Sequence, residues 1–223
     1  MPAGFQAWAQ DGSGLFQIDG TYRNLFQRAR GVVATSTLYF AISGGNVSYV
    51  AVQFGGGFQS RPLIALRCTA LAAVGAIQQN PDGSWWAYVY VRGEVGTQFT
   101  WYAYDWVAGG EIANYGLVIW NPDTGQPVFD ATKKAMRVVG TVASDGISGQ
   151  TQTLPAGREY AVAANPGGRA VPTGPSAGVL MTFGASVNGG TIVLTAFQIA
   201  TLAAGVVGVN GPVAGLILDV TNY

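Results

Sequence analysis

Two neighbouring stretches of the sequence are rich in large aromatic side chains that could bind a ligand. Residues 85–92 read WWAYVYVR and residues 99–106 read FTWYAYDW. Side chains along a β-strand alternate between two faces, so each stretch would place three rings on one face. If the two strands pair, the rings join into one surface formed by Trp86, Tyr88, Tyr90, Tyr102, Tyr104 and Trp106. Trp and Tyr combine an apolar ring with a polar group, which suits sugar stacking or a protein contact.

Three uses of these six rings remain open at the level of sequence. They could pack in the core between two sheets, form a contact with another subunit or partner, or bind a receptor. The corresponding strands of the second half contain mainly Ala, Val, Leu and Thr. Any binding role of aromatic side chains is therefore expected in the first half alone.

Three acidic residues near the aromatic strands could serve in glycoside hydrolysis. Glycosidases need two carboxyl groups about 5–10 Å apart on either side of the sugar bond. Asp82, Glu94 and Asp105 are the candidates. All three, however, fall at strand ends or in loops, where acidic residues ordinarily serve solubility. We expect no catalytic residue among them and keep a glycan depolymerase as the last of three functional hypotheses.

Composition argues against several other kinds of chemistry. The chain has no histidine and a single cysteine, Cys68, so a nucleophile–His–acid triad, an intrachain disulfide and a Cys/His zinc site cannot form. Eleven basic and eleven acidic residues cancel, without a basic stripe for nucleic acid. Gly55-Gly56-Gly57 lacks the Lys and helix of a phosphate loop. We expect no cofactor, no metal and no nucleic-acid partner, and a buried Cys68.

The low charge content predicts self-association. Charged residues make up 10% of the chain, against about 25% in typical soluble domains, and residues 170–218 contain none. In the strand expected at 191–197, Ile192 and Leu194 point to one face, whereas Val193 and Phe197 point to the other. Both faces would need cover, because a monomer rarely exposes an apolar patch above a few hundred Å². We therefore expect other subunits to cover one face.

A membrane-spanning helix is not expected in this uncharged segment. Residues 190–209 are long enough to cross a bilayer. They also contain three threonines, a glutamine and several glycines, and the turn sequence VGVNGP follows at 207–212. Two strands joined by a loop fit this pattern better. The start of the chain, MPAGFQ, lacks the basic and apolar regions of a signal peptide.

The chain contains two copies of one motif. GFQAWAQDGSGLFQIDGTYRNL begins at Gly4, and GLVIWNPDTGQPVFDATKKAM begins at Gly116. With one residue dropped, the copies align Gly4 with Gly116, Trp8 with Trp120, Asp11 with Asp123, Gly14 with Gly125 and Asp19 with Asp130. Each copy predicts a strand, a turn and a return strand, that is, a hairpin whose last Asp serves the turn. The segments 102–105 (YAYD) and 216–219 (LILD) are also alike. We predict two domains, residues 1–112 and 113–223, joined near Gly109-Gly110.

The rest of the sequence predicts short strands separated by turns that are rich in Gly and Pro. The expected strands are 37–43, 47–54, 62–68, 85–92 and 99–106 in the first half and 158–164, 179–187, 191–199 and 215–221 in the second. No segment shows a helical period with caps. We predict an all-β protein of two tandem antiparallel β-sandwich domains, the first rich in aromatics and the second with uncharged strands.

The repeated motif has a form that suggests a family. It combines Gly-apolar-x-apolar-Trp, an Asn/Asp-x-x-Gly turn, an apolar return ending in Asp, and a strand with Arg, here MRVV at 136–139. This resembles the start of structural proteins from the tail tips and tail fibres of tailed bacteriophages. The second copy is the closer match, and the likeness covers about 45 residues.

The resemblance implies a non-enzymatic part of the virion, in the tail tip, baseplate or tail fibre. Such a protein would assemble in the host cytoplasm as a homo-oligomer, with a trimer favoured, and would contact other tail proteins. It could also contribute to host attachment through a surface receptor or glycan. The alternatives are a receptor- or carbohydrate-binding module that uses the aromatic strands of the first domain, and a glycan depolymerase.

Overall fold

The computed structural model describes residues 4–8, 15–19, 24–42, 45–106, 116–144, 149–164, 168–174, 177–203 and 213–222. Within these ranges the protein is all-β, and its strands pair in antiparallel sheets. The predicted fold class is confirmed to that extent. No helix in the described ranges is long and apolar enough to cross a membrane. The expected turns at 10–14 and 207–212 and the expected domain join at Gly109-Gly110 lie outside these ranges.

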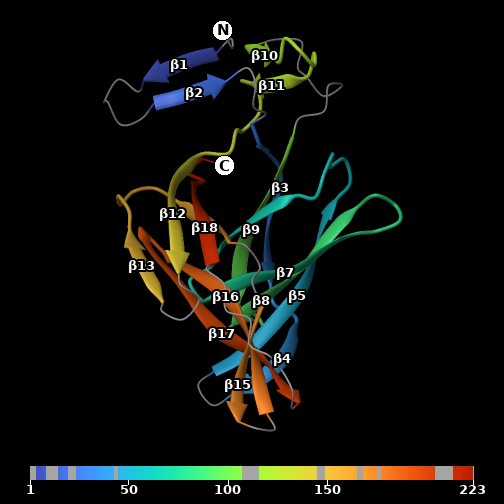
Figure 1. Ribbon diagram of the computed structural model, residues 1–223, viewed down its shortest axis with the longest axis vertical. Coiled ribbons are helices and arrows are strands. Elements are labelled where there is room, and N and C mark those ends of the chain that lie inside the picture. Colours follow the sequence, from blue (N-terminus) through green and yellow to red (C-terminus); the bar gives the residue numbers. More distant parts are fainter. Residues whose placement is uncertain are drawn as a thin grey trace.

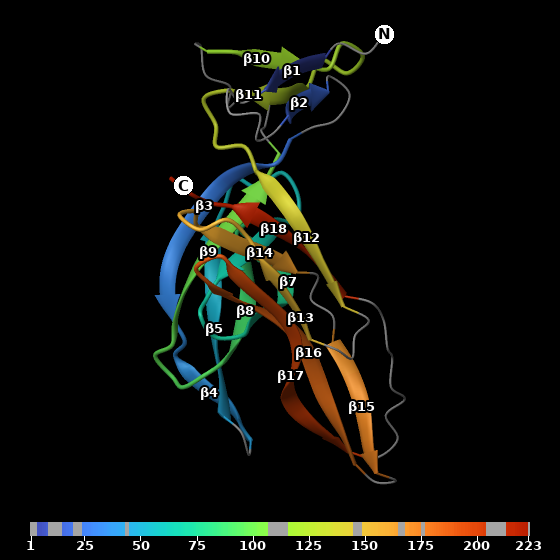
Figure 2. The ribbon, with the colours of Figure 1, turned by 90° about the vertical axis from the view of Figure 1, so that its left-hand side faces the viewer.

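Two large sheets form the body of the molecule (Figures 1 and 2). The six-stranded sheet has the order β12 (Val138–Ser144), β18 (Val213–Asp219), β14 (Tyr160–Ala164), β6 (Leu63–Arg67), β9 (Gln98–Asp105) and β3 (Phe26–Ala34). The eight-stranded sheet has the order β13 (Gln150–Thr153), β17 (Thr191–Ala203), β16 (Ala177–Asn188), β7 (Ala72–Gln79), β8 (Trp85–Arg92), β5 (Gly45–Gly55) and β4 (Thr37–Ile42). Its remaining strand, β15 (Gly168–Gly174), pairs with β16.

The two copies of the repeated motif form the hairpins that the sequence predicts. β1 (Gly4–Trp8) pairs with β2 (Leu15–Asp19), and β10 (Val118–Trp120) pairs with β11 (Pro127–Asp130). Both hairpins lie at one end of the molecule, beyond the two sheets (Figures 1 and 2). In the second copy, the Asp130 carboxylate accepts hydrogen bonds from the Thr132 backbone N–H and hydroxyl, at 2.8 and 2.7 Å. The predicted turn role is thus confirmed for Asp130.

Each predicted strand of the body is present, but several strands were not predicted. The sequence patterns missed β3, β7, β13 and β15, and the strand expected at 136–139 covers only the start of β12. β3 carries two arginines and Gly31 in its middle, which breaks the apolar alternation. The glycine is needed there, because a Cβ at Gly31 would lie 2.8 Å from the Trp101 ring. β13 reads QTQT and β7 begins with small residues, so neither carries a strong β signal.

The two halves of the chain use the same strand connections. The order β6-β9-β3 in the first half matches β14-β18-β12 in the second, and β7-β8-β5 matches β16-β17-β13. β4 and β15 have no counterpart in this comparison. Both sheets nevertheless continue from one half into the other, with β6 beside β14 and β7 beside β16. The halves therefore share one two-layered body, and the division into separate domains at residue 112 stays a prediction.

The junction between the halves is narrow in both sheets. β6 and β14 share the pair Leu66 and Val162, and β7 and β16 share the pair Ala72 and Ala185. One further backbone bond, 2.6 Å from the Val187 N–H to the Cys68 carbonyl, crosses nearby. Cys68 is buried, as predicted, and burial raises the pKa of its thiol.

Apolar cores fill the space between the sheets in each half, and others connect the halves. Ile192 and Leu194 of β17 are fully buried in the core of the second half. Phe197, on the opposite face of β17, is 2% exposed because it packs with Val47 and Ala73 of the first half. The expectation that other subunits cover this face is therefore wrong at Phe197, since the chain itself covers the ring.

Candidate functional site

The six aromatic residues predicted to share one surface do not share it, and this expectation is corrected. β8 lies between β7 and β5 in the eight-stranded sheet, whereas β9 lies between β6 and β3 in the six-stranded sheet. The two strands face each other across the sandwich. Their inner faces, with Val89 of β8 and Trp101 of β9, pack in the same core. Their outer faces consequently lie on opposite sides of the body.

Tyr102 and Tyr104 are buried. They are 2% and 1% exposed and pack with Ala161, Ala163 and Leu218 of the second half. Burial raises the pKa of the Tyr102 hydroxyl. Trp106 follows the last residue of β9 and is half-buried. The two tyrosines are thus buried, but on the face of β9 that points away from the eight-stranded sheet, so they do not pack in the core between the two sheets.

Trp86, Tyr88 and Tyr90 do remain together, on the outer face of β8. The inward residues between and beside them, Ala87 and Val89, are fully buried, so alternation turns the three rings outward. Two more rings join them from the neighbouring strands, Tyr49 of β5 and Tyr39 of β4. We call this set the aromatic row: Tyr39, Tyr49, Trp86, Tyr88 and Tyr90.

The rings of the aromatic row contact one another in a continuous series. The centroids of Trp86 and Tyr88 are 4.8 Å apart, and those of Tyr88 and Tyr49 are 5.6 Å apart. Tyr39 lies 5.4 Å from Tyr49 and 5.0 Å from Tyr90. Most of these pairs are edge-to-face, the arrangement that aromatic quadrupoles favour. The row is therefore an ordered surface, not a collection of separate side chains.

The aromatic row is partly open to solvent. Tyr39 is 42% exposed, and the other four residues are half-buried. Tyr90 is held by its surroundings, because its ring lies over Gly75, where a Cβ would come within 2.7 Å of it. Burial, together with the neighbouring tyrosines, raises the pKa of Tyr90 to about 12. Its hydroxyl therefore stays protonated at neutral pH and can both donate and accept hydrogen bonds.

A cavity of about 340 Å³ adjoins the aromatic row at Tyr90, and we call it the tyrosine cavity. It lies at the junction of the halves, where β7 and β16 separate after their single residue pair. Its lining includes Arg61, Val74, Gly75, Tyr90, Thr182 and Ile199. Residues of both halves thus border the same hollow.

A second cavity, of about 460 Å³, lies where β6 and β14 separate. Its lining is mostly aliphatic and includes Leu63, Ile64, Ile77 and Leu216. Arg61 and Val74 border both cavities, so the hollows adjoin each other at this point of the junction. Arg61 is exposed and forms no ion pair with any residue in the described part of the chain.

Of the three carboxylates considered for glycoside hydrolysis, Glu94 lies far from the other two, and Asp105 is buried. Asp82 and Glu94 flank opposite ends of β8, and Glu94 and Asp105 flank opposite ends of β9. Each of these strands has eight residues, which corresponds to about 26 Å at about 3.3 Å per residue. That exceeds the separation of a glycosidase pair. Asp105 is also 1% exposed, which leaves no approach for a sugar.

Each of these carboxylates instead holds a turn or loop. Asp82 accepts bonds from the Ser84 N–H at 2.9 Å and hydroxyl at 2.6 Å, which lowers the pKa of Asp82. Glu94 accepts two bonds from the Asn46 amide, at 3.0 and 2.9 Å. Asp105 accepts bonds from the Gln59 N–H and from the Ser60 N–H and hydroxyl.

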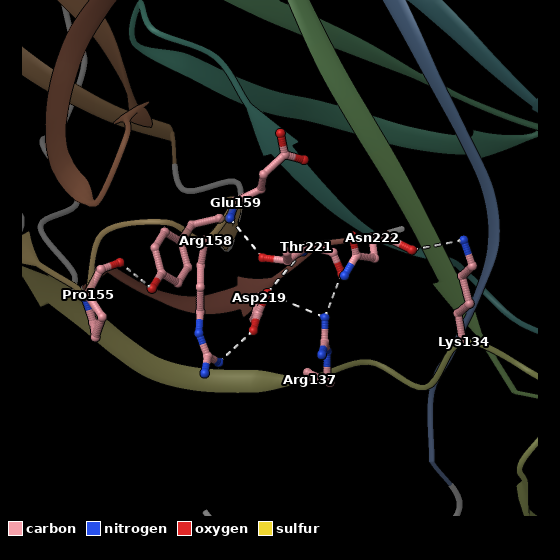
Figure 3. Close-up of polar contacts among 9 residues, drawn as sticks. Lys134, Arg137, Pro155, Arg158, Glu159, Asp219, Thr221 and Asn222 are labelled. Carbon is pink, nitrogen blue, oxygen red and sulfur yellow. Dashed lines mark hydrogen bonds and ion pairs between the residues drawn. The ribbon is translucent and has the colours of Figure 1, made fainter. Parts of the chain in front are cut away.

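A cluster of polar contacts surrounds Asp219 at the end of β18 (Figure 3). Its carboxylate lies 2.9 Å from Arg158 and 3.4 Å from Arg137, and it accepts a 3.0 Å bond from the Thr221 N–H. Burial by itself would raise the pKa of Asp219, but the bonds from Thr221 and the two guanidinium groups outweigh it and hold that pKa below its usual value. This cluster fastens the segments before β12 and β14 to the end of β18.

The described residues contain no group of three or more acidic or cysteine side chains that could hold a metal ion. Comparison with known proteins gives no relative. No family model matches the sequence, no curated protein matches it, and no solved structure matches the fold.

Sequence reasoning missed Tyr39, Tyr49 and Arg61. Both tyrosines lie in strands that the sequence predicts, and alternation alone assigns each of them to a face. Their contact with Tyr88 and Tyr90 depends on the pairing of β5 with β8 and of β4 with β5. Arg61 precedes β6 in a loop without a motif, so no local pattern indicates that it borders a cavity.

Proposed function

We propose that this chain is a non-enzymatic structural component of a tailed-phage virion, in the tail tip, baseplate or tail fibre, that contributes to attachment. The observation that carries the attachment role is the aromatic row. Five large rings in mutual contact lie on the outer face of a sheet, and Tyr39 remains 42% exposed. Tyr and Trp are enriched at recognition surfaces because they offer a large, rigid and amphipathic contact area.

The place in the virion is supported by the repeated motif and by the composition. The chain has two copies of a motif that resembles the start of tail proteins, and both copies form hairpins. Charged residues are few, as expected for a protein whose surface is covered in an assembly. Other tail proteins and further copies of this chain are the proposed partners.

Exposed apolar residues on edge strands support self-association. Val32 of β3 is 64% exposed, Leu38 of β4 is 49% exposed, and Val138 of β12 is 47% exposed. β3 and β12 end the six-stranded sheet, and β4 ends the eight-stranded sheet. Open strand edges with apolar side chains favour pairing with another chain. We propose a homo-oligomer, with a trimer favoured by the resemblance to tail fibres.

The virion assignment is tested by labelling purified phage particles with an antibody raised against this chain. Electron microscopy should show the label at the end of the tail or along the fibres. Label on the capsid, or intact particles that contain no copy of the chain by mass spectrometry, would contradict the assignment.

The attachment role is tested by competition. Purified protein should reduce adsorption of the phage to its host, and the variants Trp86→Ala and Tyr88→Ala should compete less well. Trp120→Ala is a matched control, because Trp120 is 47% exposed but lies in the β10–β11 hairpin, away from the aromatic row. Equal competition by all four proteins would remove the row from attachment.

A carbohydrate-binding module is the second candidate function. The aromatic row favours it, since sugar rings stack on Trp and Tyr. The adjoining tyrosine cavity favours it too, because its volume falls in the usual range for a small ligand, about 300–1,000 Å³. In a tail protein the two functions would coincide, with the glycan as the host receptor.

A further inference from the structure

We propose that the aromatic row and the tyrosine cavity together bind an acidic saccharide, with Arg61 paired to a carboxylate of the sugar. This inference rests on the proposed attachment role of the row and adds the chemical class of its ligand. Tyr90 makes the connection, because it belongs to the row and also lines the cavity. A chain of sugars that stacks along Trp86 and Tyr88 would reach the cavity at the Tyr90 end.

The charge at the cavity determines the class of ligand. Arg61 is the charged residue among the described residues that line the tyrosine cavity, and none of those lining residues has a carboxylate that could neutralise it. It is exposed and has no ion pair elsewhere in the described part of the protein. A guanidinium group presents a planar set of N–H donors that matches a carboxylate in two parallel bonds. A ligand that brings a carboxylate would therefore give Arg61 a partner that the described residues do not supply.

The other groups at the cavity suit the hydroxyls and rings of a sugar. Tyr90 has a hydroxyl that stays protonated at neutral pH, and Thr182 brings a second hydroxyl from β16. Val74 and Ile199 provide apolar contacts for the C–H face of the ring. The larger, mostly aliphatic cavity that Arg61 also borders has one hydroxyl residue, Thr141, among its described lining residues, which fits a sugar less well.

Binding should be measured with the full-length protein and a matched pair of ligands. One ligand is a short oligogalacturonate, and the other is the same oligomer after chemical reduction of its carboxyl groups. Calorimetry should show that the acidic form binds at least about tenfold more tightly, as expected for a charge-assisted pair. A sulfated oligosaccharide of the same length shows whether Arg61 selects a carboxylate or any anion; binding of the sulfated form equal to that of the acidic form would overturn the assignment to a carboxylate.

Variants test whether Arg61 causes the preference for the acidic form. Arg61→Gln should lower the affinity for the acidic form to that for the reduced form and leave the reduced form unaffected. Arg61→Lys should keep part of the preference, since it keeps the charge but not the planar donor set. Tyr88→Ala should weaken the binding of both the acidic and the reduced form. Arg30→Gln is the control, because it removes an exposed arginine from β3 in the other sheet. It should change the affinity for neither form.

The outcomes separate this inference from the proposed attachment role. Equal binding of the acidic and reduced forms, both weakened by Tyr88→Ala, overturns the role of Arg61 and leaves the aromatic row as a saccharide site. Binding of neither form overturns the saccharide as ligand. The adsorption competition would then be the remaining test of the attachment role, because the purified protein would also compete with the phage for a protein receptor.

Discussion

Asp105 and Asp219 occupy matching positions in the two halves, at the ends of β9 and β18, and are 1% and 2% exposed. Each binds the segment that leads into the neighbouring strand. Asp105 accepts a 2.7 Å bond from the Ser60 hydroxyl before β6, and Asp219 pairs with Arg158 before β14 at 2.9 Å. Both aspartates thus hold the segment before the neighbouring strand. Asp105 does so through neutral donors, and Asp219 does so through a guanidinium group.

Replacing Asp105 should destabilise the protein. Asp105→Ala removes the buried acceptor of three part-buried hydrogen bonds from Gln59 and Ser60, which at about 1 kcal/mol per bond should cost about 3 kcal/mol in the free energy of unfolding. Urea denaturation followed by tryptophan fluorescence measures this. Asp123→Ala is the control, because Asp123 is exposed in the β10–β11 turn and should change stability by less than about 0.5 kcal/mol. Equal stability of the two variants would contradict the role of Asp105.

Asp219 should make stability dependent on acid pH. Its folded-state pKa lies below the ordinary value, so its contribution is present above the unfolded pKa of about 3.9 and is lost as pH falls through the folded pKa. Wild-type protein should therefore exceed Asp219→Asn in melting temperature at pH 7. The difference should shrink below pH 4, where the carboxylate of the wild type becomes protonated. A difference that stays constant from pH 7 to pH 2 would show that the charge is not involved.

The close approach of Trp101 to β3 should make Gly31 sensitive to substitution. A Cβ at Gly31 would lie 2.8 Å from the Trp101 ring, so Gly31→Ala should force the ring to move and cost about 1–3 kcal/mol. Gly56→Ala serves as control, since no atom lies within 4 Å of a Cβ there. Thermal unfolding and near-ultraviolet circular dichroism report stability and ring packing. Unchanged values for Gly31→Ala would mean that β3 does not press against Trp101 as described.

Self-association should depend on the apolar edge of β12. Light scattering at micromolar concentration should give a mass above the 23.1 kDa of the monomer, and a trimer is expected. Val139→Lys places a charge on this edge, where Val139 is 42% exposed, and should shift the protein toward monomer. Gln150→Lys, on the polar edge strand β13, should not. A stable monomer of the wild type would contradict self-association, whereas a dimer or hexamer would contradict only the trimer.

Sequence patterns predicted the class of the fold and the faces of single strands, but not which strands meet. Alternation correctly placed Trp86, Tyr88 and Tyr90 on one face of β8. Neighbouring strands in sequence often pair, yet the loop after β8 crosses to the other sheet, where β9 begins. The Glu94 carbonyl holds this crossing by accepting bonds from Thr35, Ser48 and Thr97. The bonds from Thr35 and Ser48 are long-range and leave no local signature, so the placement of Tyr102 and Tyr104 could not be predicted.

The junction of the halves joins like strand to like strand, β6 to its counterpart β14 and β7 to its counterpart β16. Like elements also meet in the isologous contact of a two-fold homodimer, in which one surface meets a copy of itself. Fusion of two such subunits into one gene would account for the repeat, and a covalent link would make their association independent of concentration. After fusion, the two copies no longer need to have the same sequence. One half of this chain could then keep a row of aromatic rings while the other evolved uncharged strands, an asymmetry that no dimer of identical subunits can have.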